Sequence, residues 1–453
     1  MIIVAAAVLA LMSAVAEAPG AAYREPGTGA ASSAQQPAPV PGSRFPVPQP
    51  GSELTIYLMT MGYGDQVWER FGHNAIRIVD AARGTDSVYN WGTFDFRQPN
   101  FLRRFMTGNT LYWMQGDGMA ETMNTYRYLN RSVWMQELDL TPAERAAVRD
   151  FIAWNALPEN RYYRYDYYLD NCSTRVRDVI DRVVGGQLRA STASRLTSAT
   201  YRFHTQRLLQ FDRAVALGTM IGLGEDADRP ITEWEEMFLP TRLQEHLRSV
   251  RIRDASGATH PLVKQEQQLF AASRPPEPAQ PPDDTMRNLL IGAAVAAALV
   301  LLARAARTGG RLARTGFATA ATVWAALGGV LGIVLVIGWT ATRHVFMAHN
   351  ENLLQFDPLS FALAVVLPFA FARHAGAARV ARILSAAVAG IAVVGFAMQL
   401  LPWFDQTNGA VIALALPAHL ALAWAVRLVV VEPQTSPANA GVAAGAVASR
   451  TAA

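Results

Sequence analysis

The sequence predicts an α+β soluble domain followed by an all-α domain of about five transmembrane helices. Hydrophobic residues make up 51% of the 453 residues, and beyond Met286 they gather into long apolar runs. Residues 53–270 instead have the mixed composition of a globular domain, with strand-like segments ahead of an amphipathic helix. A Pro-rich stretch at 271–286 predicts a linker between the two domains.

The N-terminal segment predicts export of the soluble domain. Residues 1–18, "MIIVAAAVLALMSAVAEA", are an apolar run that ends in an A-x-A-like cleavage site. No Lys or Arg precedes the run, so a cleaved signal peptide and an uncleaved signal anchor both fit. Residues 19–52 are rich in Pro, Gly, Ala and Ser, a composition that cannot bury a core and that predicts a disordered linker.

The apolar C-terminal part, residues 287–431, predicts the transmembrane domain, and residues 432–453 a cytoplasmic tail. The candidate spans lie at 287–303, 317–340, 359–372, 383–401 and 410–431.

Arginine distribution predicts the orientation of these spans. The loops after the first and third spans are rich in arginine: Arg304, Arg307, Arg311, Arg314, Arg373, Arg379 and Arg382. The loops after the second and fourth spans carry only Arg343. Because arginine-rich loops stay in the cytoplasm, the soluble domain is predicted to lie outside it.

The net charge of +4 does not indicate nucleic acid binding. Much of the positive charge sits in the loops that orient the membrane domain, and no basic helix is interleaved with aromatic residues.

Cys172 is the only cysteine, and it begins a predicted helix. An apolar stripe continues from it at helical spacing, Asp170 or Asn171 is in position to cap the helix, and Gly185-Gly186 ends it. Free N–H groups at a helix start favour a thiolate, so the position suits a nucleophile. The alternative is a buried, inert cysteine.

A thiol needs a base, and His73 is the candidate. It opens a strand-like segment, Ala75 to Val79, between the strand predicted for "ELTIYLMTMG" and the one predicted for "SVYNWGTFDF". Asn90 is predicted to orient the imidazole by accepting its Nδ1 proton, with Asp95 as the second candidate. Asn171 or backbone N–H groups near Cys172 are predicted to bind an oxyanion. The alternative for His73 is a structural, hydrogen-bonded histidine.

The other histidines are predicted to lie at the surface or at membrane boundaries, apart from His419 within the last predicted span. No metal-ligand spacing and no phosphate loop is present, so the sequence predicts neither a metal site nor a cofactor.

The motifs "RFGHNAIRI", "VYNWGTFDF", "YRYDYYLDNCSTRVRD" and "EEMFLPTRL" together resemble the N-terminal periplasmic domain of Lnb-type bacterial lipoprotein N-acyltransferases. The order of His before Cys is also similar to circularly permuted NlpC-type papain-like acyltransferases. In some of those proteins a second histidine stands where this chain has Asn90. The resemblance implies a papain-like α+β fold in the periplasm and a location in the bacterial inner membrane.

The resemblance also implies an activity: transfer of an acyl chain from a membrane phospholipid, through a thioester on Cys172, to the N-terminal amine of a lipoprotein. In the loop "ATRHVFMAHNENLLQFDP", His349 and Asn352 are candidate substrate-binding residues, against the simpler alternative of a solvated loop. A periplasmic cysteine peptidase or amidase acting on cell-wall peptides, and a non-catalytic membrane-anchored envelope protein, remain as alternatives.

Overall fold

The computed structural model describes residues 49–254, 256–374 and 376–430. The predicted signal segment 1–18, nearly all of the linker 19–52 and the tail 432–453 lie outside the described residues.

The soluble domain is built on a seven-stranded antiparallel sheet in the order β11-β5-β1-β2-β3-β4-β6. Its strands are β1 (Leu54–Met61), β2 (His73–Asp80), β3 (Thr85–Thr93), β4 (Leu111–Gly118), β5 (Val133–Leu138), β6 (Tyr162–Arg164) and β11 (Val263–Phe270). The three strands predicted from the sequence are therefore confirmed as β1, β2 and β3, neighbours in the sheet.

Helices and two small two-stranded sheets complete this domain. The helices are η1 (Val67–Glu69), α2 (Phe101–Met106), α3 (Met119–Tyr128), α4 (Pro142–Asn155), α5 (Cys172–Val183), α6 (Gln187–Thr192), α7 (Tyr201–Leu209), α8 (Arg213–Gly222), η2 (Glu225–Ala227), α9 (Glu233–Glu236) and α10 (Pro240–Ser249). The two small sheets pair β7 (Leu196–Thr200) with β8 (Pro230–Thr232), and β9 (Arg251–Arg253) with β10 (Thr259–Pro261).

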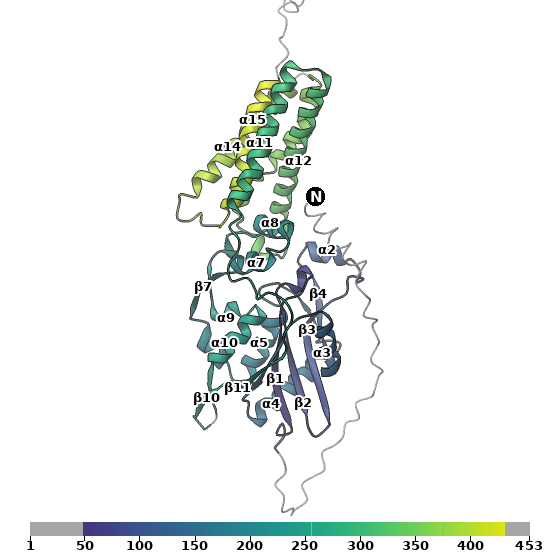
Figure 1. Cartoon of the computed structure of the whole chain (residues 1–453), viewed down its shortest axis with the longest axis vertical. Helices are drawn as coiled ribbons and strands as arrows, with labels where there is room; N and C mark the ends of the chain where they lie inside the picture. The colour runs from purple at the N-terminus through teal and green to yellow at the C-terminus, as the bar shows by residue number, and fades with distance from the viewer. Residues whose placement is uncertain (1–48, 255, 375, 431–453) are drawn as a thin grey trace, which may run out of the picture.

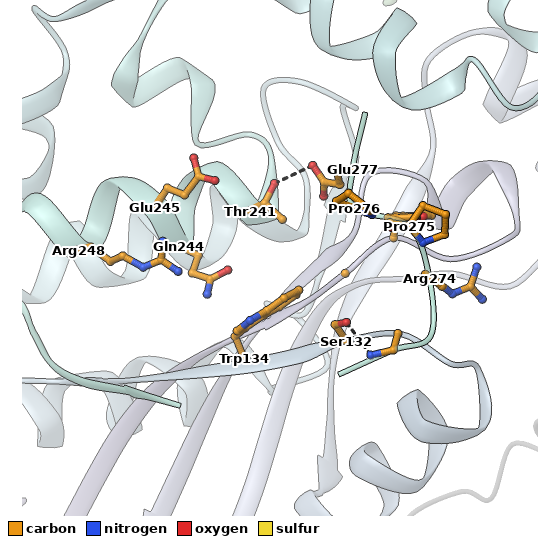
Figure 2. Close-up of a pocket in the computed structure, with 13 residues that line it drawn as sticks. Ser132, Trp134, Thr241, Gln244, Glu245, Arg248, Arg274, Pro275, Pro276 and Glu277 are labelled. Atoms are coloured by element: carbon orange, nitrogen blue, oxygen red, sulfur yellow. Dashed lines mark hydrogen bonds between the residues drawn. The ribbon is translucent and has the colours of Figure 1, made fainter. Parts of the chain in front are cut away.

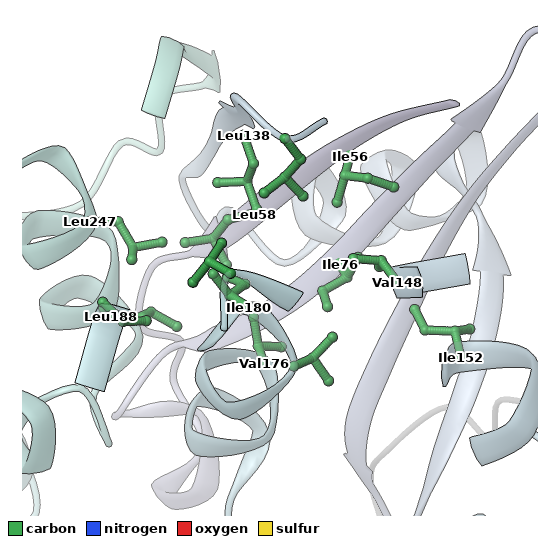
Figure 3. Packing of buried hydrophobic residues seen from close by; sticks show 14 of the residues in the cluster. Ile56, Leu58, Ile76, Leu138, Val148, Ile152, Val176, Ile180, Leu188 and Leu247 are labelled. Carbon is green, nitrogen blue, oxygen red and sulfur yellow. The ribbon is translucent and has the colours of Figure 1, made fainter. Parts of the chain in front are cut away.

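The main core lies between one face of the sheet and α4, α5 and α10. Side chains alternate along a strand, so Ile76 of β2 meets Val176 and Ile180 of α5, as Figure 3 shows. The other face carries Met61 and Ala75 and packs against α3. Both faces of the central strands are therefore buried.

Helix α5 begins at Cys172 because the preceding residue caps it. The side-chain oxygen of Asn171 accepts from the backbone N–H groups of Ser173 (2.8 Å) and Thr174 (3.0 Å). The helix ends at Val183, and Gly185 comes two residues later with φ of 69°, the left-handed conformation that glycine adopts without strain. The predicted helix, its cap and its stop are confirmed.

The C-terminal region is all-helical. Its helices are α11 (Thr285–Thr308), α12 (Arg311–Ala341), η3 (Val345–Met347), η4 (Glu351–Leu354), α13 (Leu359–Phe371), α14 (Ala377–Met398) and α15 (Gly409–Val429). Four of them are long and apolar enough to cross a membrane, and a fifth span is formed if the bent pair of 345–354 and 359–371 counts as one. An α+β domain followed by an all-α region with four to five apolar candidate spans is thus confirmed.

The two regions are joined by more than the chain connection. Figure 1 shows α7 and α8 between the sheet and the helical bundle. Ile221 of α8 lies in one apolar cluster with Leu335 of α12 and Val411 of α15. The backbone N–H of Gly224 donates to the carbonyl of Phe346 (2.7 Å), and a Cβ at Gly224 would lie 1.8 Å from the carbonyl oxygen of Ala348. Only glycine permits this close approach.

Candidate active site

Two buried polar residues fix the start of α5 against the sheet. The hydroxyl of Ser173 lies 2.8 Å from the side-chain oxygen of Asn74 and 2.7 Å from the carbonyl oxygen of Met237, and it shares its one proton between these two acceptors. The Asn74 amide donates to Thr60 Oγ1 (2.9 Å) on β1. Ser173 and Asn74 directly follow Cys172 and His73 in the sequence. The contact therefore holds the two candidate catalytic residues at the same end of the sheet.

Cys172 is half-buried and is a free thiol. Burial raises the pKa of the Cys172 thiol above its ordinary value, while the backbone N–H groups of Asn74, Ser173 and Cys172 itself face the sulfur and act to lower it. The N–H groups at the helix start therefore act in the predicted direction, but burial has the larger effect and the net shift of the pKa is upward. The helix start supplies N–H groups to the site, but deprotonation requires a base.

His73 is held by Asn90, and Asn90 is held by Asp117. His73 Nε2 lies 3.0 Å from Asn90 Oδ1, and Asn90 Nδ2 donates to Asp117 Oδ2 (3.2 Å). Because the carboxylate takes the amide N–H, the amide oxygen faces the imidazole and accepts from Nε2–H. The predicted pairing of His73 with Asn90 is present, but through Nε2 and not through Nδ1 as expected. Nδ1 is then the unprotonated, basic nitrogen.

The imidazole of His73 is neutral at pH 7. Burial lowers its pKa to about 4, the positive charge of Arg131 acts in the same direction, and the hydrogen bond with Asn90 opposes them. Arg131 also acts to lower the pKa of Cys172. Arg131 Nε donates to the carbonyl of Gly62 (2.8 Å), just beyond the β1 residue that pairs with His73. One guanidinium thus influences both candidate catalytic groups.

His73 and Cys172 share no hydrogen bond among the described residues. The side chain of Asn74 points to the face of the sheet that packs on α5, so the preceding side chain, His73, belongs to the opposite face. His73 is the first residue of β2 and Cys172 the first of α5, so both lie at the ends of their elements. The resting arrangement is a thiol and a neutral imidazole near one strand end, and catalytic hydrogen bonds often form only with substrate present.

Asn171 is committed to the fold. Its amide nitrogen donates to the carbonyls of Tyr167 and Phe238, both at 3.0 Å, and its oxygen caps α5. Neither amide hydrogen is free to bind an oxyanion, which leaves the backbone N–H groups as donors. Asp95, the second candidate to orient His73, is instead ion-paired with Arg97 (3.1 Å).

The structure adds two residues to the site, Gly92 and Tyr163, that the sequence did not indicate. A Cβ at Gly92 would lie 3.6 Å from Cys172 Cβ and 4.0 Å from the Tyr163 hydroxyl, so both groups border this glycine. Gly92 has φ of 94°, at an irregularity in the pairing of β3 with β4. The Tyr163 hydroxyl is buried without a partner among the described residues, and burial raises its pKa well above the ordinary value. Tyr163 therefore stays protonated and can donate.

The two candidate substrate-binding residues of the predicted loop differ in their surroundings. The amide of Asn352 is fully buried and donates to the carbonyls of Met220 (3.2 Å) and Ile221 (3.0 Å), at the end of α8. His349 is exposed and lies 3.4 Å from Asp226. Asn352 thus fastens the loop to α8, whereas His349 remains accessible at the junction between the two regions.

The prediction that His204 lies at the surface is wrong. His204 is fully buried, and its Nε2 lies 2.9 Å from one oxygen of Glu236, whose other oxygen lies 2.7 Å from His246 Nε2. Arg207 donates to His204 Nδ1 (2.9 Å), which fixes a neutral imidazole. This network connects α7, α9 and α10. Among the described residues, no group of three or more His, Cys, Asp or Glu side chains is arranged to hold a metal ion.

Two cavities are present in the sheet domain, and neither is lined by Cys172 or His73. One, of about 340 Å³, is shown in Figure 2. Thr241 of α10 donates to Glu277 of the Pro-rich segment (3.3 Å), and Trp134 of β5 lies below this pair in the view. The other, of about 480 Å³, is lined by Trp91, Trp154 and the ion pair of Asp170 with Arg175. In the first cavity the segment predicted as a simple linker forms a wall, fixed by a bond from the Tyr63 hydroxyl to the Pro275 carbonyl (2.8 Å).

Comparisons with known proteins give one match. No curated protein and no solved structure matches the chain. Residues 49–209, which include His73, Asn90 and Cys172, match the family model described as the Lnb N-terminal periplasmic domain. This match supports the assignment of residues 49–209 as an Lnb N-terminal periplasmic domain.

Proposed function

We propose that the protein is a membrane-bound, thiol-dependent acyltransferase that moves an acyl chain from a phospholipid to the N-terminal amine of a lipoprotein. One observation carries the proposal. The only cysteine of the chain begins a helix, faces three backbone N–H groups and lies at the same sheet end as a neutral histidine that Asn90 orients. A thiol nucleophile, an oriented histidine base and N–H donors for an oxyanion are the groups that nucleophilic acyl transfer uses.

In the first step Nδ1 of His73 takes the proton of Cys172, and the thiolate attacks the ester carbonyl of the phospholipid. The N–H groups of Asn74 and Ser173, with the Tyr163 hydroxyl, stabilise the tetrahedral oxyanion. The ester C–O bond breaks, the proton passes from His73 to the leaving alkoxide, and lysophospholipid departs. The acyl group remains on Cys172 as a thioester.

In the second step the amine of the acceptor attacks the thioester carbonyl. His73 takes a proton from the attacking nitrogen and returns it to the sulfur, so an amide and the free thiol are produced. Water is the competing nucleophile, and an apolar site next to the membrane keeps it away.

Aromatic side chains near the site support a lipid as donor. A row of rings connects α2 to the surroundings of Cys172, and its members are Phe105, Phe101, Phe94, Tyr112 and Tyr165. Successive ring centroids are 6.2, 6.2, 4.9 and 4.3 Å apart, and Cys172 acts on the pKa of Tyr165 at the end of the row. Such an apolar row suits an acyl chain better than a peptide.

The apolar helices suggest a multi-pass membrane protein, and we place it in the bacterial inner membrane with the sheet domain in the periplasm. A phospholipid donor then lies directly below the domain. His349, exposed at the junction, is proposed to contact the head group or the acceptor.

The test uses full-length protein in lipid vesicles with labelled phospholipid and an apolipoprotein. The proposal requires release of lysophospholipid and label on the acceptor, both lost in Cys172→Ala and His73→Ala. His260→Ala is the matched control, because His260 pairs with Asp139 far from the site and should retain activity. Cleavage of cell-wall peptides without lipid turnover would support the peptidase alternative instead.

A further inference from the structure

Helix α2 presents an apolar patch to the surroundings. Three apolar residues of this six-residue helix are exposed: Leu102 (43%), Phe105 (40%) and Met106 (55%). We call these three side chains the α2 patch. Apolar side chains gathered on one short helix usually mark a contact surface.

The α2 patch lies beside the end of a membrane-spanning helix. The carbonyl of Thr107 accepts from the backbone N–H of Arg343 (3.0 Å), and His344 Nε2 lies 2.9 Å from the carbonyl of Phe105. Arg343 and His344 come just after α12, which ends at Ala341. Figure 1 shows α2 at the end of the sheet nearest the bundle.

The position of Trp339 on α12 indicates the depth of this contact. Trp339 is 42% exposed, and tryptophan is enriched at the membrane–water interface. At a rise of about 1.5 Å per residue, Trp339 lies only about 3 Å from the end of the helix at Ala341. The interfacial layer is roughly 5–8 Å thick on each side of a bilayer, so α2, bonded to the residues just after α12, falls at its level.

The charges around the patch match a phospholipid surface. Arg97 is paired with Asp95, whereas Arg103, Arg104 and Arg343 have no carboxylate partner among the described residues. Unpaired guanidinium groups bind phosphate oxygens well, and apolar side chains beside them enter the acyl region.

We propose that α2 is an interfacial membrane element. Leu102, Phe105 and Met106 enter the periplasmic leaflet, and Arg103, Arg104 and Arg343 bind lipid phosphates. The sheet domain is then fixed to the bilayer at a second place besides its connections to the bundle, and the aromatic row that starts at Phe105 opens at the lipid surface. This inference does not depend on the acyltransferase proposal.

The experiment measures the depth of labelled positions in an inactive background. In full-length Cys172→Ser, which has no other cysteine, single cysteines are introduced as Phe105→Cys or Met106→Cys and labelled with an environment-sensitive fluorophore. Ala82→Cys is the matched control, since Ala82 is exposed in the β2–β3 turn at the opposite end of the sheet. The proteins are reconstituted into vesicles of phosphatidylethanolamine and phosphatidylglycerol that contain spin-labelled lipid.

Lipid-borne spin labels should quench the labels at 105 and 106 several-fold more than the label at 82, and aqueous iodide should show the reverse order. Charge reversal by Arg103→Glu together with Arg104→Glu should reduce the lipid quenching at 106. Iodide access at 105 and 106 equal to that at 82 would overturn the proposal. Shielding from both quenchers would also overturn it, because a protein partner would then cover the patch. Since the background cannot form a thioester, neither result depends on the proposed reaction.

Discussion

The hydroxyl of Ser173 is hydrogen-bonded to the side-chain oxygen of Asn74 at 2.8 Å, and both residues are fully buried. The contact joins the residue after the candidate nucleophile to the residue after the candidate base. The relative position of Cys172 and His73 therefore depends on the hydrogen bond between Ser173 and Asn74.

Replacing Ser173 with alanine should lower both stability and turnover. Asn74 Oδ1 and the carbonyl of Met237 would lose the buried donor that they share, at a cost of about 1–3 kcal/mol in the free energy of unfolding. Loss of alignment should also reduce kcat more than it changes KM for the lipid. The matched control is Ser249→Ala, since Ser249 is exposed and bonds only to a carbonyl of its own helix, and its effect should stay within about 0.5 kcal/mol. An unfolding midpoint and a kcat equal to those of the wild type would show that the Ser173–Asn74 bond positions nothing.

The acid limb of the pH profile of kcat/KM should reflect the low pKa of His73. The base is neutral above a pH of about 4, so kcat/KM should fall only as the pH drops toward about 4, well below the ordinary histidine value. Arg131→Gln removes a positive charge that disfavours the imidazolium, so the acid limb should move to higher pH. Arg131→Lys keeps the charge and is the control. Asn90→Ala should move the limb to lower pH, because the hydrogen bond with Asn90 raises the pKa of His73. A limb at the ordinary histidine value, unchanged in Arg131→Gln, would contradict this description of the base.

Tyr163→Phe should show whether the Tyr163 hydroxyl has a catalytic or a structural role. The hydroxyl is buried and has no partner among the described residues, so its removal should leave the unfolding midpoint unchanged or slightly higher. If the hydroxyl donates to the oxyanion, kcat should fall by at least about 10-fold, with little change in KM. A variant with normal kcat would remove Tyr163 from the oxyanion site, and a large loss of stability would indicate a structural role.

His349 and Asn352 should behave differently, although the sequence groups them in one loop. Asn352→Ala should lower the unfolding midpoint, because the carbonyls of Met220 and Ile221 lose their donor. His349→Ala should leave the midpoint unchanged, since its contact with Asp226 is exposed, and should raise KM for donor or acceptor. If His349→Ala has wild-type kinetics, the loop contributes to docking of the two regions and not to substrate binding.

The sequence predicted those features that depend on local pattern. Strand-like composition identified β1, β2 and β3, and the apolar stripe after Cys172, with Asn171 before it and Gly185 after it, identified α5. These signals lie within a few residues of the element that they specify, so they can be read without knowing the fold.

Features that depend on distant contacts were missed or wrong. The environment of Cys172 depends on Gly92, Arg131 and Tyr163, which come from separate elements, and the net effect of burial on its pKa is set only by their packing. His204 looked like a surface residue because its partner Glu236 is remote in sequence. The side-chain amide of Asn171 was a reasonable oxyanion donor until its contacts with Tyr167 and Phe238 were known.

The most direct test of the central claim is the intact mass of the full-length protein after incubation with phospholipid and no acceptor. The account predicts a mass increase of one acyl group on Cys172, removed by neutral hydroxylamine as expected for a thioester, and absent in Cys172→Ala. Addition of an apolipoprotein should then discharge the acyl group onto the acceptor amine. Acylation of the acceptor at the normal rate by Cys172→Ala would contradict the account.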